Sequence, residues 1–175
     1  MKIAYISTYT PRECGIATFN NNLIQAIGAN FKKQNLLETG FVVAINDSED
    51  IKQYTYPEEV KFVIRQDYQE DYIKAANYIN TSAVEVCVLE HEFGIFGGEC
   101  GNYILPLLNR LDKPLITILH TVLREPSFIQ KAIIREIAHQ SAGMVVMGRC
   151  AVDFLINLYQ IAPKKIKLIE HGVPD

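Results

Sequence analysis

Short apolar runs that alternate with longer segments of helical periodicity constrain the fold of this chain most strongly. The strand-like runs are residues 2–7, 40–45, 60–64, 84–89, 115–119, 143–147 and 165–169. Apolar residues recur at helical spacing in segments 15–33, 69–79, 100–111, 126–140 and 150–159. Strands that are apolar throughout and separated by helices are typical of a parallel sheet covered on both faces. Because crossovers are right-handed, we expect an α/β fold with a doubly wound, Rossmann-like sheet.

The composition fits one globular domain and excludes several classes of function. The 175 residues are 49% hydrophobic and 21% charged, which is enough chain to bury a sizeable core. A net charge of −3 gives no basic field for nucleic acid. We expect no transmembrane segment and no signal peptide, because the apolar runs are too short. No CxxC pair occurs, so we expect free thiols in a reducing cytoplasm, and no zinc, for Cys14, Cys87, Cys100 and Cys150.

Four polar loops follow strand-like runs, and each contains residues that carry chemistry. They are residues 7–15, 90–99, 120–122 and 170–172. In an open α/β sheet, ligands bind at the carboxyl ends of the strands, where the strand-to-helix loops converge. We therefore expect the four loops to form one site.

The first loop reaches a predicted helix at Gly15. A glycine there lets a ligand approach the backbone, and the free N–H groups and the helix dipole favour phosphate. The loop has neither the GxGxxG pattern of dinucleotide binding nor the Gly-Lys-Ser/Thr of a P-loop. A glycine needed only for the strand-to-helix turn explains this position equally well.

The second loop combines acid, imidazole and glycine. Glu90-His91-Glu92 is not the HExxH motif, so metal binding is the weaker interpretation. Gly94, Gly97 and Gly98 permit a tight loop whose amides face a ligand, and Glu92 is suited to accept hydrogen bonds from sugar hydroxyls. Glu99 is explained by the favourable place of an acid at the start of the next helix.

The remaining candidate site residues are histidines and an arginine. His120 ends an apolar strand beside Thr121, where an imidazole can donate to a hydroxyl or polarise a leaving group; a satisfied core histidine is the alternative. His171-Gly172 is a weaker candidate for a ligand contact, and a hinge turn is the alternative explanation. Arg149, at a predicted helix start, is a candidate for phosphate, although a solvated surface charge is the commoner role.

In order and spacing, segments 7–19, 91–99, 120–122 and 171–175 resemble the N-terminal half of a retaining glycosyltransferase of family 4. The resemblance spans essentially the whole chain and implies half of the two-domain GT-B fold. It implies that residues 1–175 form the acceptor-side domain and that a donor-binding C-terminal domain is absent, so we expect a fragment. The family's first loop often has a Gly-Gly pair, whereas this chain has Cys14-Gly15.

The resemblance also implies roles for the candidate residues. His120 would be catalytic, beside the transferred sugar. Donor contacts are expected from Gly15, Ile16, Arg149, His171 and Gly172. The acceptor pocket is expected to include Arg12, Glu13, Glu92, Phe93, Gly94, Gly97, Gly98 and Thr121.

The implied partners are a nucleotide-sugar donor, a glycan or lipid-linked acceptor, and the protein's own C-terminal domain. No metal or other cofactor is expected, since amides and basic groups stabilise the leaving diphosphate. We expect a cytoplasmic protein, and a peripheral position at the inner face of the membrane stays open. Two other functions stay open: a stand-alone, non-catalytic sugar- or phosphate-binding module, and half of a GT-B-like sugar-nucleotide isomerase or phosphorylase.

Overall fold

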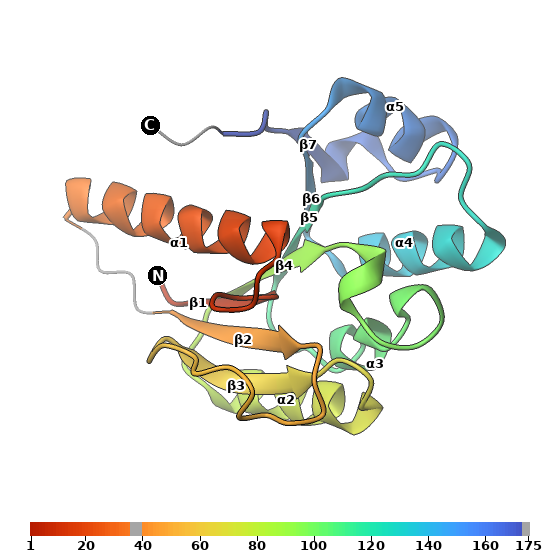
Figure 1. Cartoon of the computed structure of the whole chain (residues 1–175). Helices are drawn as coiled ribbons and strands as arrows, with labels where there is room; N and C mark the ends of the chain where they lie inside the picture. The colour runs from red at the N-terminus through yellow and green to blue at the C-terminus, as the bar shows by residue number, and fades with distance from the viewer. Residues whose placement is uncertain (36–39, 173–175) are drawn as a thin grey trace.

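A single parallel sheet organises the computed structural model, which describes residues 1–35 and 40–172. Its strand order is β3-β2-β1-β4-β5-β6-β7, and every neighbouring pair is parallel (Figure 1). The strands are β1 (Ile3–Ser7), β2 (Phe41–Asn46), β3 (Val60–Arg65), β4 (Val86–His91), β5 (Leu115–Leu119), β6 (Gly143–Val146) and β7 (Ile166–Leu168). The predicted α/β fold with a Rossmann-like parallel sheet is confirmed.

Helices cover both faces of this sheet, as the continuous apolar strands predict (Figure 1). Helix α1 (Gly15–Lys33) packs Phe19, Leu23 and Ile24 on one face, over a core that includes Tyr5 and Val88. The larger core lies on the other face, beneath α2 (Gln69–Thr81), α3 (Ile104–Leu108), α4 (Phe128–Gln140) and α5 (Arg149–Asn157). In the described part of the chain, no helix has the length and apolar character that a bilayer crossing requires.

Two elements differ from the sequence prediction. Strand β4 runs two residues further than expected, so Glu90 and His91 belong to the strand and not to the loop. Successive strand residues point to opposite faces, and these two side chains therefore enter different cores. The predicted helix 100–111 was wrong at both ends, because α3 spans only Ile104–Leu108. A 3₁₀ turn (Glu99–Gly101) precedes it, because Cys100 and Gly101 have left-handed φ values of 53° and 79°.

The strand order places β1 beside β4, although β2 and β3 lie between them in sequence. The loop after β1 leads to α1 on one face, whereas the segment after β4 leads to helices on the other (Figure 1). The two connections diverge, and such a switch point is where open α/β sheets bind ligands.

Candidate functional site

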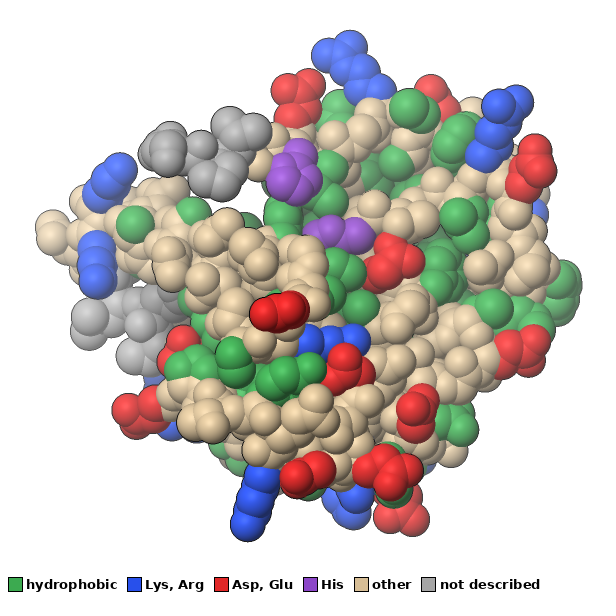
Figure 2. Space-filling model, in the orientation of Figure 1, with side chains coloured by type: hydrophobic (Ala, Val, Ile, Leu, Met, Phe, Trp, Pro, Cys, Tyr) green, Lys and Arg blue, Asp and Glu red, His purple; other side chains and the backbone are tan. Residues whose placement is uncertain are grey.

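Three polar side chains lie at the carboxyl ends of the central strands, on the α1 side of the sheet. The three are Ser7, Glu90 and His120. Each follows a residue of the α1-side core by two positions: Ser7 follows Tyr5, Glu90 follows Val88, and His120 follows Ile118. Strand periodicity therefore turns all three toward α1. Figure 2 shows two histidine side chains beside the N-terminal end of α1. Phe19 on this helix explains the grouping, since its ring centroid lies 4.9 Å from that of His120 and 5.2 Å from that of His171.

The central contact of the site joins Glu90 to His120. His120 Nε2 lies 2.8 Å from Glu90 Oε2; the glutamate side chain is fully buried, whereas the histidine side chain is 13% exposed. The backbone N–H of His120 donates to the His91 carbonyl at 3.0 Å, which fixes the start of the loop. Burial raises the pKa of Glu90, although the hydrogen bond with His120 partly opposes this. The sequence prediction had assigned no role to Glu90.

Glu92 and Thr121, both expected in an acceptor pocket, are brought together next to this pair. The Thr121 hydroxyl donates to Glu92 Oε2, and the Phe93 N–H donates to Glu92 Oε1 at 3.0 Å. Each carboxylate oxygen therefore accepts from a protein group and retains a second lone pair. The arrangement fixes the direction of Glu92 before any ligand arrives.

Arg12 ties the first loop to the neighbouring strand. Its Nη1 donates to the Ile45 carbonyl at 3.0 Å, and its Nε lies 3.3 Å from Asp47 Oδ2. Only 11% of this side chain is exposed, so most of its hydrogen-bonding capacity is used within the chain. Glu13 beside it is exposed.

Gly15 begins α1 and is open to solvent. A Cβ at this position would meet no atom within 4 Å, and its φ is not left-handed. Packing and backbone conformation therefore do not require glycine here, which favours the ligand explanation over the turn explanation. Ile16, the next residue, is half-buried against the larger core.

Cys14 immediately precedes this helix and has an altered thiol. Burial of the sulfur raises its pKa, but the Thr8 hydroxyl, the amides of Ala17 and Ile16, and the Arg12 charge favour the thiolate more strongly. The pKa of Cys14 therefore lies below its usual range. The Thr8 oxygen lies 3.5 Å from the sulfur. Thr8 makes the largest contribution to this lowering, ahead of the helix amides and Arg12.

The glycines after β4 differ from one another. Gly94 is open, since a Cβ there would meet nothing within 4 Å. A Cβ on Gly97 would lie 2.1 Å from the Gln66 carbonyl oxygen, and the Gly97 amide donates to the Tyr72 hydroxyl at 3.1 Å. Gly98 has a φ of 78°. The fold itself therefore requires Gly97 and Gly98, and only Gly94 presents unobstructed backbone.

His91 enters the core, contrary to its prediction as a loop residue. Its side chain is fully buried between Phe93 and Phe96, with ring centroids 5.1 and 5.7 Å away. Burial lowers its pKa to about 3, so the imidazole is neutral. Sequence reasoning had no signal for this burial, since a histidine between two glutamates suggests a solvated loop.

Sequence reasoning also missed buried polar groups on the α1 side. Ser7 Oγ, both amide atoms of Asn20, and Glu90 Oε1 are buried without a hydrogen-bond partner among residues 1–35 and 40–172. The remaining candidates lie nearer the surface. Arg149 is the exposed first residue of α5, and His171 and Gly172 are exposed. The end of the predicted motif, 173–175, lies outside the described residues.

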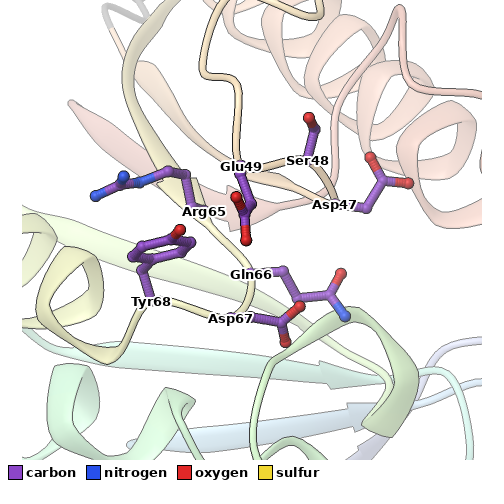
Figure 3. A pocket seen from close by; sticks show the side chains of 7 residues that line it. All are labelled: Asp47, Ser48, Glu49, Arg65, Gln66, Asp67 and Tyr68. Atoms are coloured by element: carbon purple, nitrogen blue, oxygen red, sulfur yellow. The ribbon is translucent and has the colours of Figure 1, made fainter.

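A small hollow lies at the carboxyl ends of β2 and β3 (Figure 3). Its volume of about 30 Å³ suits one or two water molecules and not a sugar. Arg65 on its wall already binds Asp71 at 2.7 and 3.0 Å and stacks on Tyr68. Groups of three or more His, Cys, Asp or Glu side chains suited to a metal do not occur in the described part of the chain.

Comparison with known proteins gives little further information. No protein-family model matches the chain, and no curated protein matches it. A solved structure described as a short-chain alcohol dehydrogenase from Burkholderia multivorans is similar over 97% of this chain and 95% of that chain, with 10% identity and a TM-score of 0.43. A likeness at this level carries no inference about activity or cofactor.

Proposed function

We propose that this chain is the acceptor-side half of a retaining GT-B glycosyltransferase. It would work with a donor-binding domain of the full protein to move a sugar from a nucleotide sugar to a hydroxyl of a glycan or lipid-linked acceptor. One observation carries the proposal: at the β1–β4 switch point, the start of α1 adjoins a histidine held by a buried carboxylate. A helix N-terminus is suited to a phosphate, and an oriented imidazole can donate to a sugar or phosphate oxygen.

The start of α1 is the proposed diphosphate contact. The helix begins at Gly15, where a Cβ would meet nothing within 4 Å, so a ligand can reach the amides. Free amides and the helix dipole at such a start favour a phosphate oxygen. Charge that develops on a leaving diphosphate is stabilised by such fixed dipoles without an obligatory metal.

His120 is the proposed contact to the transferred sugar, and Glu92 with Thr121 borders the acceptor. His120 is positioned by Glu90 and Phe19 and retains partial exposure. Glu92 is oriented by Thr121 and by the Phe93 amide, so its free lone pairs have a defined direction for a sugar hydroxyl. Positioning of this kind supplies much of the rate of a two-substrate reaction.

The test is product analysis with the natural full-length protein and a panel of nucleotide sugars, with and without acceptors. Sugar transfer to an acceptor supports the proposal. A rearranged sugar nucleotide formed without acceptor, or a reaction that consumes phosphate, would instead indicate an isomerase or a phosphorylase. Binding without turnover would indicate a binding module.

A matched pair of variants tests the site itself. Gly15→Val should raise the donor KM at least tenfold, because methyl groups would occupy the phosphate approach. Gly148→Val makes the same change at the N-cap of α5, where a Cβ also meets nothing within 4 Å, and should retain the parent KM. Equal effects of the two substitutions would contradict a diphosphate at α1.

A further inference from the structure

We propose that Glu90 and His120 form one proton-carrying unit, in which Glu90 is the positioning residue and His120 Nδ1 is the atom presented to a ligand oxygen. The inference rests on the proposed function only for the identity of that oxygen, a phosphate or sugar oxygen of the substrates. The pair itself is a property of the free protein and can be measured without any substrate.

The imidazole is held at one nitrogen and free at the other. Nε2 is 2.8 Å from Glu90 Oε2, and the Phe19 ring meets the imidazole edge-on at an interplanar angle of 88°. Among residues 1–35 and 40–172, the hydrogen bond of the His120 ring is made by Nε2 and not by Nδ1. Because Glu90 is fully buried and His120 is partly exposed, a ligand reaches this pair only through the histidine.

The number of protons on the pair decides whether Nδ1 carries a proton or is bare. When the pair is neutral overall, it consists of a carboxylate with an imidazolium, or of a carboxylic acid that donates to Nε2 of a neutral imidazole. In both arrangements Nδ1 carries a proton and is a donor. When the pair carries one negative charge, Nε2–H donates to the carboxylate, so Nδ1 is bare and accepts. One proton taken up by the pair therefore converts Nδ1 from acceptor to donor, wherever the shared proton lies.

The surroundings favour retention of that proton. Glu90 Oε1 has no hydrogen-bond partner in the described part of the chain, so the carboxylate depends on His120 alone. Burial without other partners raises the pKa of Glu90. His91, on the same strand, stays neutral because burial lowers its pKa to about 3.

In the described part of the chain, no charged side chain on the α1 side forms a hydrogen bond or ion pair with the Glu90–His120 pair. From α1 the imidazole meets the apolar ring of Phe19, beyond which lies His171. Glu92, the next acid along the chain, is bound to Thr121 and to the Phe93 amide and makes no hydrogen bond to His120. The neutral, donor state of the pair suits an anionic oxygen, so ligand affinity should fall as rising pH removes the proton.

The test is ¹⁵N NMR of the histidine rings in ligand-free protein, followed over the pH range in which the fold persists. When the pair carries one negative charge, the parent should show Nε2 protonated and Nδ1 bare, and uptake of one proton should protonate Nδ1. A parent spectrum in which Nδ1 keeps its proton and Nε2 loses it would overturn the proposal without any variant.

Glu90→Gln keeps the size and hydrogen-bonding ability of the side chain but cannot share a proton. The neutral imidazole of this variant should therefore be a mixture of the Nδ1–H and Nε2–H tautomers, whereas in the parent pair with one negative charge Nε2 carries the proton. Glu92→Gln removes a nearby carboxylate that does not touch the imidazole and should keep the parent tautomer. The same tautomer mixture in both variants, or in neither, would overturn the proposed pair.

The two proposals can fail separately. If the tautomers are as expected but the full-length protein neither binds nor transfers sugars, the proposed function fails and the proton-carrying pair stands. If sugars are transferred while Glu90→Gln leaves the His120 tautomer unchanged, the function stands and the pair is refuted.

Discussion

His91 provides a test of how the buried imidazole affects the stability of the whole domain. Its ring is enclosed by Phe93 and Phe96, and neither nitrogen has a hydrogen-bond partner in the described part of the chain. Burial lowers its pKa from 6.5 to about 3, and the neighbouring charge of His120 contributes in the same direction. The folded protein therefore keeps His91 neutral at a pH where the unfolded chain protonates it. His91→Leu removes this titration at a similar side-chain volume.

The magnitude follows from linkage. Because the folded pKa lies below the unfolded one, the stabilisation is complete above pH 6.5 and is lost as the pH falls toward 3. At pH 5 the loss is about 2 kcal/mol, since each pH unit below the unfolded pKa costs about 1.4 kcal/mol. The raised pKa of Glu90 acts with the opposite sign, giving stability at low pH that is lost as the pH rises. It is present in both proteins and cancels in the comparison.

The assay is urea unfolding of the parent and His91→Leu at pH 7 and pH 5. The free energy of unfolding of the parent should fall by about 2 kcal/mol more than that of the variant between the two pH values. His139→Leu is the matched control, because His139 is exposed on α4 and should leave the pH dependence of the parent unchanged. Parallel losses in the parent and His91→Leu would refute the reasoning.

Two further predictions concern the scaffold around the site. Gly97→Ala should lower the free energy of unfolding by about 2 kcal/mol or more, because its Cβ would lie 2.1 Å from the Gln66 carbonyl oxygen; Gly94→Ala, with nothing within 4 Å, should change it by less than about 1 kcal/mol in the same urea assay. Asp71→Asn should destabilise at pH 7 by about 2–3 kcal/mol, because Arg65 binds this carboxyl at 2.7 and 3.0 Å. Burial opposes ionisation of Asp71, but Arg65 outweighs it and lowers the pKa below 3.8. The stabilisation is therefore lost as the pH falls below that value, and unfolding series for the two proteins should converge in acid.

The fold was predictable because its signals are local. Apolar runs and helical spacing located every strand to within two residues, and α1 at Gly15–Lys33 agrees with the prediction. The end of β4 was not predictable by the same rule. Glu90 and His91 break the apolar pattern, and Glu90 is accommodated by His120, which lies 30 residues away along the chain. A partner at that separation cannot be identified from periodicity.

Sequence reasoning placed the candidate residues at one edge of the sheet but did not show their hydrogen bonds. His120, Thr121 and Glu92 do lie together, because parallel strands end at one edge of the sheet. Arg12 illustrates the rest: the family resemblance implied a ligand contact, yet its guanidinium binds the carbonyl of Ile45. The burial of Asn20 could not be predicted from the sequence, because a polar residue in a helix is usually assumed to be solvated. Donors and acceptors that are used within the chain can be recognised only in three dimensions.

The strand order also determines when the central strand is complete during synthesis. One edge of β1 pairs with β2, but the other pairs with β4, where Ile3 lies opposite Val86. A nascent chain that has not yet released β4 from the ribosome therefore carries an apolar strand with one open edge, the kind of edge that recruits other strands. Glu90 arrives on that same late strand. Translational pausing before β4 should accordingly favour aggregation through the open edge of β1.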